Sequence, residues 1–159
     1  YGQARWPGWW GSGAGTRADT VGNAQHGFTS IRTTSTDATP VYLRAARYND
    51  ASTTTGSPLT LAANRHYLFT VKIIGRAYSG TNSGKVFAKE IMGVIRRDGS
   101  NNTALVGSLT EREIADEMTD AWSATVEADD TNEELDVKAT GASGDSIHWV
   151  ASVEIVEVG

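Results

Sequence analysis

Apolar and polar residues alternate with a period of two along the last sixteen residues, 144–159. One parity is apolar and contains Ile147, Trp149, Ala151, Val153 and Ile155, whereas the other contains His148, Ser152 and Glu154. This period is expected when one face of a strand meets a core and the other meets solvent. Residues 122–128 and 135–139 alternate in the same way and are joined by the polar residues 129–133. The last third of the chain therefore predicts an antiparallel meander that ends in a long, half-buried strand.

The middle of the chain has the same strand-like character. Runs rich in β-branched and aromatic residues occupy 28–33, 40–45, 66–78, 86–97 and 103–109. Segments 79–84 and 98–102 have the small, polar composition of tight turns. Roughly eight strands separated by turns predict an all-β fold, an antiparallel β-sandwich of jelly-roll type, with the strand at 66–78 in a central position.

Residues 110–120 are ambiguous. Thr110 and Glu113 have the spacing of a helix capping box, and Ile114 and Met118 are four residues apart. Two apolar positions in this stretch support at most a short helix. The pattern fits a short helix or an irregular loop equally well.

The first 27 residues differ from the rest. They hold seven of the 17 glycines and three of the five tryptophans, with no sustained period. We therefore expect an irregular N-terminal arm or linker at 1–27 and a β-sandwich domain at 28–159. Trp6, Trp9 and Trp10 are candidate contact residues that could stack on sugar rings or, as we favour, anchor the arm against its own core or a neighbouring subunit.

Composition limits the classes of partner. The net charge is −5, and the 14 basic residues are scattered, which argues against nucleic acid. The chain has no cysteine, so disulfides, thiolate zinc sites and a cysteine nucleophile are excluded. No apolar run approaches the roughly 18 residues of a membrane span, and we expect no membrane insertion.

Two segments resemble ligand-binding motifs but lack residues that those motifs require. The run at 80–85 resembles a phosphate-binding loop, yet Ser79 and Val86 stand where that motif needs glycine and serine or threonine, so we predict a hairpin turn. Residues 130–134 resemble a calcium loop, but Leu135 stands where such a loop needs glycine. We interpret this segment as a solvated acidic turn and expect no metal and no cofactor.

The sequence also gives little reason to expect catalysis. No serine lies in a nucleophile elbow, and whether two carboxylates could act together depends on their separation in space. Glu90, in the middle of a predicted strand, is the most interesting acid, although a cross-strand Lys72 or Arg76 would explain it. The three histidines do not have zinc spacing, and we interpret His148 as an outward strand residue. We predict no catalytic residues and rank an enzyme third.

Three segments, 33–45, 88–108 and 122–159, together resemble a domain that recurs in phage and prophage virion proteins, notably tail fibre, tail spike and related appendage proteins. The ending is the most specific part, with a Trp-led strand, an Ala-Asp-Asp hairpin and a final strand containing Ile147, Trp149 and Val153. The resemblance spans about residues 30–159 and leaves the arm outside.

This resemblance implies a non-enzymatic structural or adhesive module of the virion. It further implies a homotrimer that contacts other virion proteins, is extracellular once assembled, and serves host attachment or virion assembly. Loops 50–58, 79–85 and 98–102 are candidate receptor contacts by position alone, and a host-surface glycan is a candidate partner. The alternative is a carbohydrate-binding module of a secreted bacterial protein, in which the tryptophans form the sugar platform.

Overall fold

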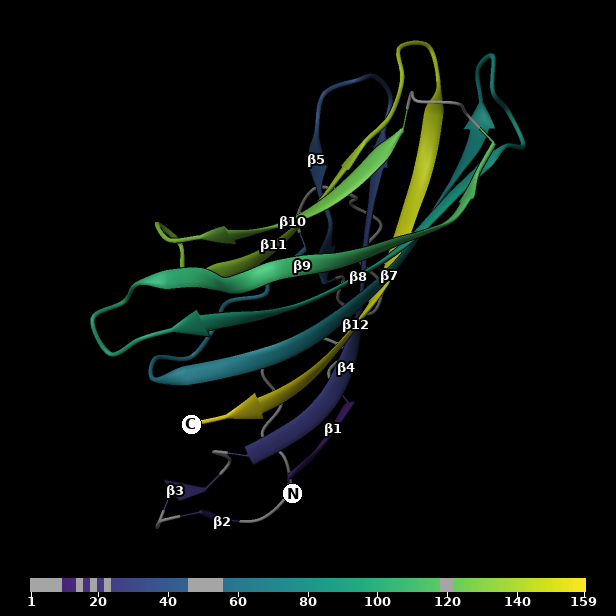
Figure 1. Cartoon of the computed structure of the whole chain (residues 1–159). Coiled ribbons are helices and arrows are strands. Elements are labelled where there is room, and N and C mark those ends of the chain that lie inside the picture. The colour runs from purple at the N-terminus through teal and green to yellow at the C-terminus, as the bar shows by residue number, and fades with distance from the viewer. Residues whose placement is uncertain (1–9, 14–15, 18–19, 22–23, 46–55, 118–121) are drawn as a thin grey trace.

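The computed structural model describes residues 10–13, 16–17, 20–21, 24–45, 56–117 and 122–159. These residues form antiparallel strands in two principal sheets (Figure 1), which confirms the predicted all-β sandwich. No helix occurs in the described ranges, and therefore none that is long and apolar enough to cross a membrane.

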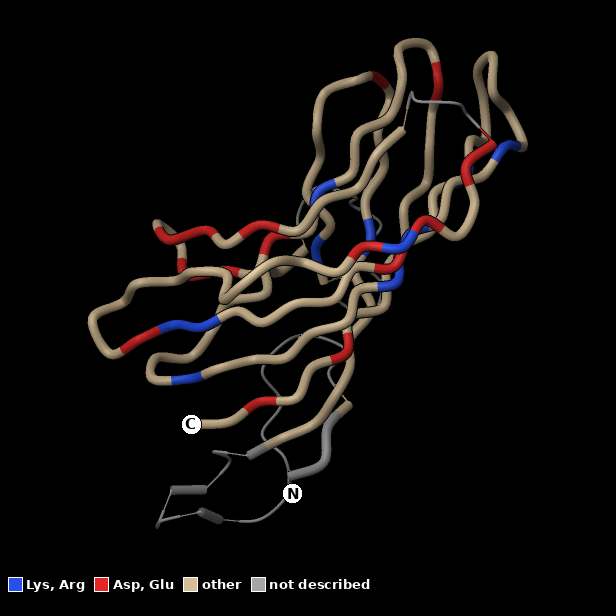
Figure 2. The backbone as a smooth tube through the Cα atoms, in the orientation of Figure 1, with Lys and Arg blue, Asp and Glu red and all other residues tan. Residues whose placement is uncertain are grey.

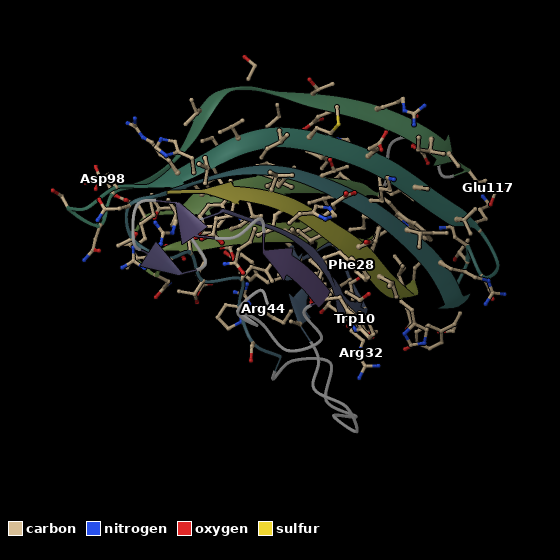
Figure 3. All side chains as sticks on the ribbon, turned by 90° about the horizontal axis from the view of Figure 1, so that it is seen from below. Trp10, Phe28, Arg32, Arg44, Asp98 and Glu117 are labelled. Carbon is tan, nitrogen blue, oxygen red and sulfur yellow. The ribbon has the colours of Figure 1, made fainter. Side chains whose placement is uncertain are left out.

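The larger sheet has seven strands, in the order β1-β4-β12-β7-β8-β9 with β6 beside β4. They are β1 (Trp10–Gly13), β4 (Ala24–Ser35), β6 (Arg44–Ala45), β7 (Arg65–Ser79), β8 (Val86–Arg97), β9 (Thr103–Asp116) and β12 (Ser146–Val158). The smaller sheet has the order β10-β11-β5, with β10 (Ser123–Asp129), β11 (Glu134–Thr140) and β5 (Val41–Tyr42). A separate pair joins β2 (Thr16–Arg17) to β3 (Thr20–Val21). The large sheet curves over the smaller one (Figure 3).

The core lies between the two sheets and is centred on Trp149 of β12. Its indole ring is fully buried and meets the rings of Trp122 and Phe87 edge-on, at centroid distances of 5.8 and 6.0 Å. The indole N–H donates a hydrogen bond to Ser35 Oγ at 2.9 Å, which satisfies the one polar atom of this side chain. The ring contacts therefore tie β12 to β8 and to the residue that precedes β10.

The final strand differs from the sequence prediction in its neighbours. β10 and β11 form the predicted hairpin, but β12 leaves the smaller sheet and pairs with β4 on one side and β7 on the other. The predicted meander is therefore wrong at its last step. The alternation identified the buried face of β12 correctly, but a period of two carries no information about which strands lie beside it.

Two other segments are more regular than predicted. Residues 103–116 form one strand, so neither a helix nor an irregular loop occupies 110–116. Pairing with β8, which continues across two register shifts, holds this segment extended and overrides the local capping-box pattern. Within the expected irregular arm, residues 10–13 form β1, which pairs with β4. Four paired residues are too few to reveal a period in the sequence.

We expect Gly75→Ala to destabilise the protein by about 1–3 kcal/mol, because the added methyl group would overlap the six-membered ring of Trp149 across the β7–β12 pair. The ring is fully enclosed and has no space into which to move. Urea unfolding of the variant measures the change. Thr125→Ala, at an exposed site on β10, is the control and should stay within about 0.5 kcal/mol of the unaltered chain. Equal stability of Gly75→Ala and the parent would contradict the close packing.

Candidate functional site

One face of the large sheet is not covered by the rest of the described chain. The inner face supplies the core, whereas the side chains of opposite parity, here called the outer face, point away from the smaller sheet (Figure 3). The outer face contains Trp10 of β1; His26, Phe28, Ser30, Arg32 and Thr34 of β4; His148, Val150, Ser152, Glu154, Val156 and Val158 of β12; Leu68, Thr70, Lys72, Ile74 and Arg76 of β7; Ala88, Glu90, Met92, Val94 and Arg96 of β8; and Val106, Thr110, Arg112 and Ile114 of β9.

Apolar side chains of the outer face form two rows that run across the strands. The strand registers place Val156, Leu68, Val94 and Val106 in the first row. The second row contains Val150, Ile74 and Ala88, with Ile114 beside it. Leu68 is 54% exposed and Ile74 is 50% exposed, although both lie on the long central strand β7. Rows of exposed apolar side chains on this scale are typical of a contact surface.

A polar row separates the two apolar rows. Cross-strand register aligns Ser152, Lys72, Glu90 and Arg112. Glu90 accepts a hydrogen bond from Arg112 at 2.8 Å and lies 4.0 Å from Lys72 Nζ. One of the two predicted partners of Glu90, Lys72, is therefore confirmed. Arg112 was missed because the sequence gave no reason to place residue 112 on a strand.

The edge of the outer face carries the one described member of the tryptophan cluster. Trp10 is 73% exposed and lies in register with Phe28 on the adjacent strand (Figure 3). Trp10 is thus not anchored in the chain's own core. Trp6 and Trp9 lie outside the described residues. The sequence grouped three tryptophans, and the structure places one of them, Trp10, on the outer face.

The loop at 79–85 is held in a fixed shape by Asp145, which precedes β12. The buried Asp145 carboxylate accepts hydrogen bonds from the backbone N–H of Asn82 at 3.0 Å and from its side-chain amide at 2.6 Å. These bonds, above all the one from the Asn82 side chain, lower the pKa of Asp145 below its usual value. Gly80 and Gly84 adopt positive φ angles of 100° and 89°. The segment is therefore the predicted hairpin turn.

The turn at 98–102 is organised by Asp98 in a similar way. Its carboxylate accepts the backbone N–H groups of Ser100 and Asn102 and the Asn102 side-chain amide. The hydrogen bonds from Asn102 are the main cause of the lowered pKa of Asp98. Of the third candidate loop, 50–58, residues 50–55 lie outside the described ranges. Both fully described loops are thus shaped by a side-chain carboxylate.

The smaller sheet gathers three acids that the sequence did not group. Carboxylate oxygens of Asp129, Glu134 and Asp136 lie within 4.8 Å of one another. Arg44 contacts Asp136 at 2.8 Å and Glu134 at 3.6 Å, so its guanidinium supplies the opposing charge. Burial raises the pKa of Glu134, and the charge of Arg44 acts in the opposite direction. Alternate residues of β11 share a face, which is why positions 134 and 136 meet here. We interpret the cluster as an ion-pair network.

Comparison with known proteins does not assign the chain to a family. No model of a known protein family matches the chain, and no curated protein matches it either. The phage appendage resemblance therefore remains a prediction. The outer face, as the largest surface of unexplained apolar character in the described chain, is the feature from which function is argued below.

We expect Asp145→Asn to lower the melting temperature at pH 7, because the neutral side chain loses the ionised acceptor for Asn82. The folded pKa of Asp145 lies below its unfolded value. Its stabilising contribution is therefore complete above the unfolded pKa, near 4, and disappears as the pH falls through the folded pKa. Melting curves from pH 7 to pH 2 should show the variant and the parent converging in acid. Glu113→Gln, on the exposed edge of β9, is the control. A constant gap at all pH values would contradict this role.

Proposed function

We propose that this chain is a non-enzymatic structural and adhesive module of a phage virion appendage, assembled as a homotrimer and serving host attachment or virion assembly. The single observation that supports the proposal most is the open outer face, where Leu68, Ile74, Val150 and Val156 remain about half exposed on central strands. Such a face suits a macromolecular contact better than the turnover of a small molecule, because it spreads over many strands. The sequence resemblance supplies the virion context.

The rigidity of the candidate loops supports an adhesive role. Asp145 and Asp98 fix loops 79–85 and 98–102 by hydrogen bonds to backbone N–H groups. Loops that are already ordered lose little conformational entropy on binding. A homotrimer would present three copies of each loop, and multivalent contact would strengthen weak individual contacts through effective concentration. No bond is made or broken in this mode of action.

A carbohydrate-binding module is the second candidate, favoured by the position of Trp10. This indole is 73% exposed and is in register with Phe28, so two aromatic side chains stand together at one edge of the sheet. Tyr78 and His148 form another partly exposed pair, stacked at a centroid distance of 4.1 Å. Exposed rings of this kind can stack on the apolar face of a sugar.

The proposed homotrimer predicts a solution mass close to three times the 16.9 kDa of the chain. Light scattering after size exclusion, over a hundredfold range of concentration, measures it. A constant trimer mass would support the proposal. A mass of one chain at every concentration would contradict it, and attention would then turn to the carbohydrate-binding alternative.

The carbohydrate-binding alternative predicts that Trp fluorescence responds to a glycan and that Trp10→Ala removes most of the affinity. A stacked aromatic ring contributes about 1 kcal/mol or more, so we expect binding at least about fivefold weaker. Titration with bacterial surface polysaccharides tests this. Trp122 and Trp149 are buried, so a fluorescence response that remains in Trp10→Ala would point to Trp6 or Trp9 as further sugar contacts. The absence of any glycan response in the parent would exclude this alternative for the polysaccharides tested.

A further inference from the structure

We infer that the outer face is the surface through which copies of this chain meet, with Lys72 of one copy paired with Glu154 of the next. The inference rests on the proposed homotrimer and specifies which surface holds it together. It differs from an anchoring role for the tryptophan arm, because the decisive contacts come from the central strands β12 and β7. The occupant of the face is a further copy of the same chain.

The size of the outer face fits this role. Six strands lie across it, in the order β1 to β9, with β12 and β7 in the middle. Five spacings of about 4.8 Å between the six strands, and about eleven residues of β12 rising about 3.4 Å each, give the face an area of roughly 900 Å². A stable protein interface buries about 800 Å² on each partner. The face is therefore as large as one complete interface.

The distribution of apolar side chains also fits a contact between copies. Val150 and Ile74 lie on the neighbouring central strands in one row, and Val156 and Leu68 lie on the same two strands in the other row. The two central strands thus carry apolar side chains on both sides of the charged residues Lys72 and Glu154. The face is the convex side of the curved sheet (Figure 3), so copies would meet first along these central strands.

Charged side chains of both signs lie between the two apolar rows. Lys72 and Arg112 are basic, and Glu90 and Glu154 are acidic. Within one copy Glu90 forms ion pairs with both cations, at 2.8 Å from Arg112 and 4.0 Å from Lys72. The side chain of Lys72 nevertheless remains 65% exposed, and that of Glu154 remains 51% exposed beside His26. Each copy therefore offers a cation on β7 and an anion on β12, which a second copy can match.

Three further arginines give the outer face an excess of positive charge, but their registers place them outside the rows that contain Lys72 and Glu154. By register, Arg76 and Arg96 lie toward opposite ends of the face. Arg32 lies on β4 opposite Val150 and is labelled in Figure 3, and Figure 2 shows where basic and acidic residues occur along the chain. Charges at a rim stay hydrated when an interface forms. Pairing through the edge strand β9 is a poorer alternative, because its exposed run Glu111, Arg112 and Glu113 is the kind of charged edge that prevents strand addition.

A charge exchange tests the inference on the full chain. Lys72→Glu alone and Glu154→Lys alone should each weaken assembly at least about tenfold, because each variant places like charges opposite one another between copies. The double variant Lys72→Glu with Glu154→Lys restores opposite charges and should recover most of the parent's assembly. Light scattering over a dilution series gives the dissociation midpoint. Thr125→Glu, at an exposed site on β10 of the smaller sheet, is the control for an added negative charge and should assemble like the parent.

The outcomes separate the inference from the proposed function. If the parent is a trimer and both single variants remain trimers at every dilution, the outer-face contact is wrong while the homotrimer stands. If the parent is a monomer, both are wrong. Loss of assembly that the double variant does not recover would overturn the Lys72–Glu154 pair. Ile74→Ser tests the apolar row independently and should also weaken assembly, whereas Tyr42→Ser, on the smaller sheet, should not. Circular dichroism confirms that each variant is folded.

Discussion

The burial of Trp149 between the two sheets is the contact on which the rest of the structure depends. Its ring meets Trp122 and Phe87, and its N–H is satisfied by Ser35. The contact requires β12 to lie between β4 and β7, and it requires glycine at position 75, where any side chain would overlap the ring. Close packing of this kind makes the position of one strand determine its neighbours, since a shift of one residue would turn the indole to solvent.

The outer face follows from the same strand. Successive side chains of a strand point to opposite faces, so the inward position of Trp149 also fixes Val150 outward. Residues directly opposite each other on neighbouring strands share a face. Register then carries the effect across the sheet, from Val150 to Ile74 and onward to Ala88. The apolar rows are thus not scattered exposed residues. They form because the core fixes the strand register and because the sequence has apolar residues at outward positions, where polar residues would also be compatible with the fold.

Local alternation was enough to predict the strands and their buried parity, and it identified Trp149 and Val153 as core residues. It could not predict neighbours, so the place of β12 between β4 and β7 was missed. It also failed at 110–116, where pairing with β8 decides the conformation of a segment with little pattern of its own. The contact surface was missed for a related reason. The strand pattern shows which residues face out, but only sheet order shows that outward residues of distant strands join into rows.

The described part of the chain combines a covered core with an apolar face that none of its own strands covers. Replacing Leu68 or Ile74 with polar residues would cost the monomer little, because both side chains already lie about half in water. The same residues contribute substantially when a second surface removes them from solvent, at about 25 cal/mol for each Å² of apolar area buried. In the proposed contact, the charges of Lys72, Glu90 and Glu154 would add selectivity, because they favour only registers in which opposite signs meet. In that proposed contact, the apolar rows would supply the affinity, and the charged residues between them would determine the register.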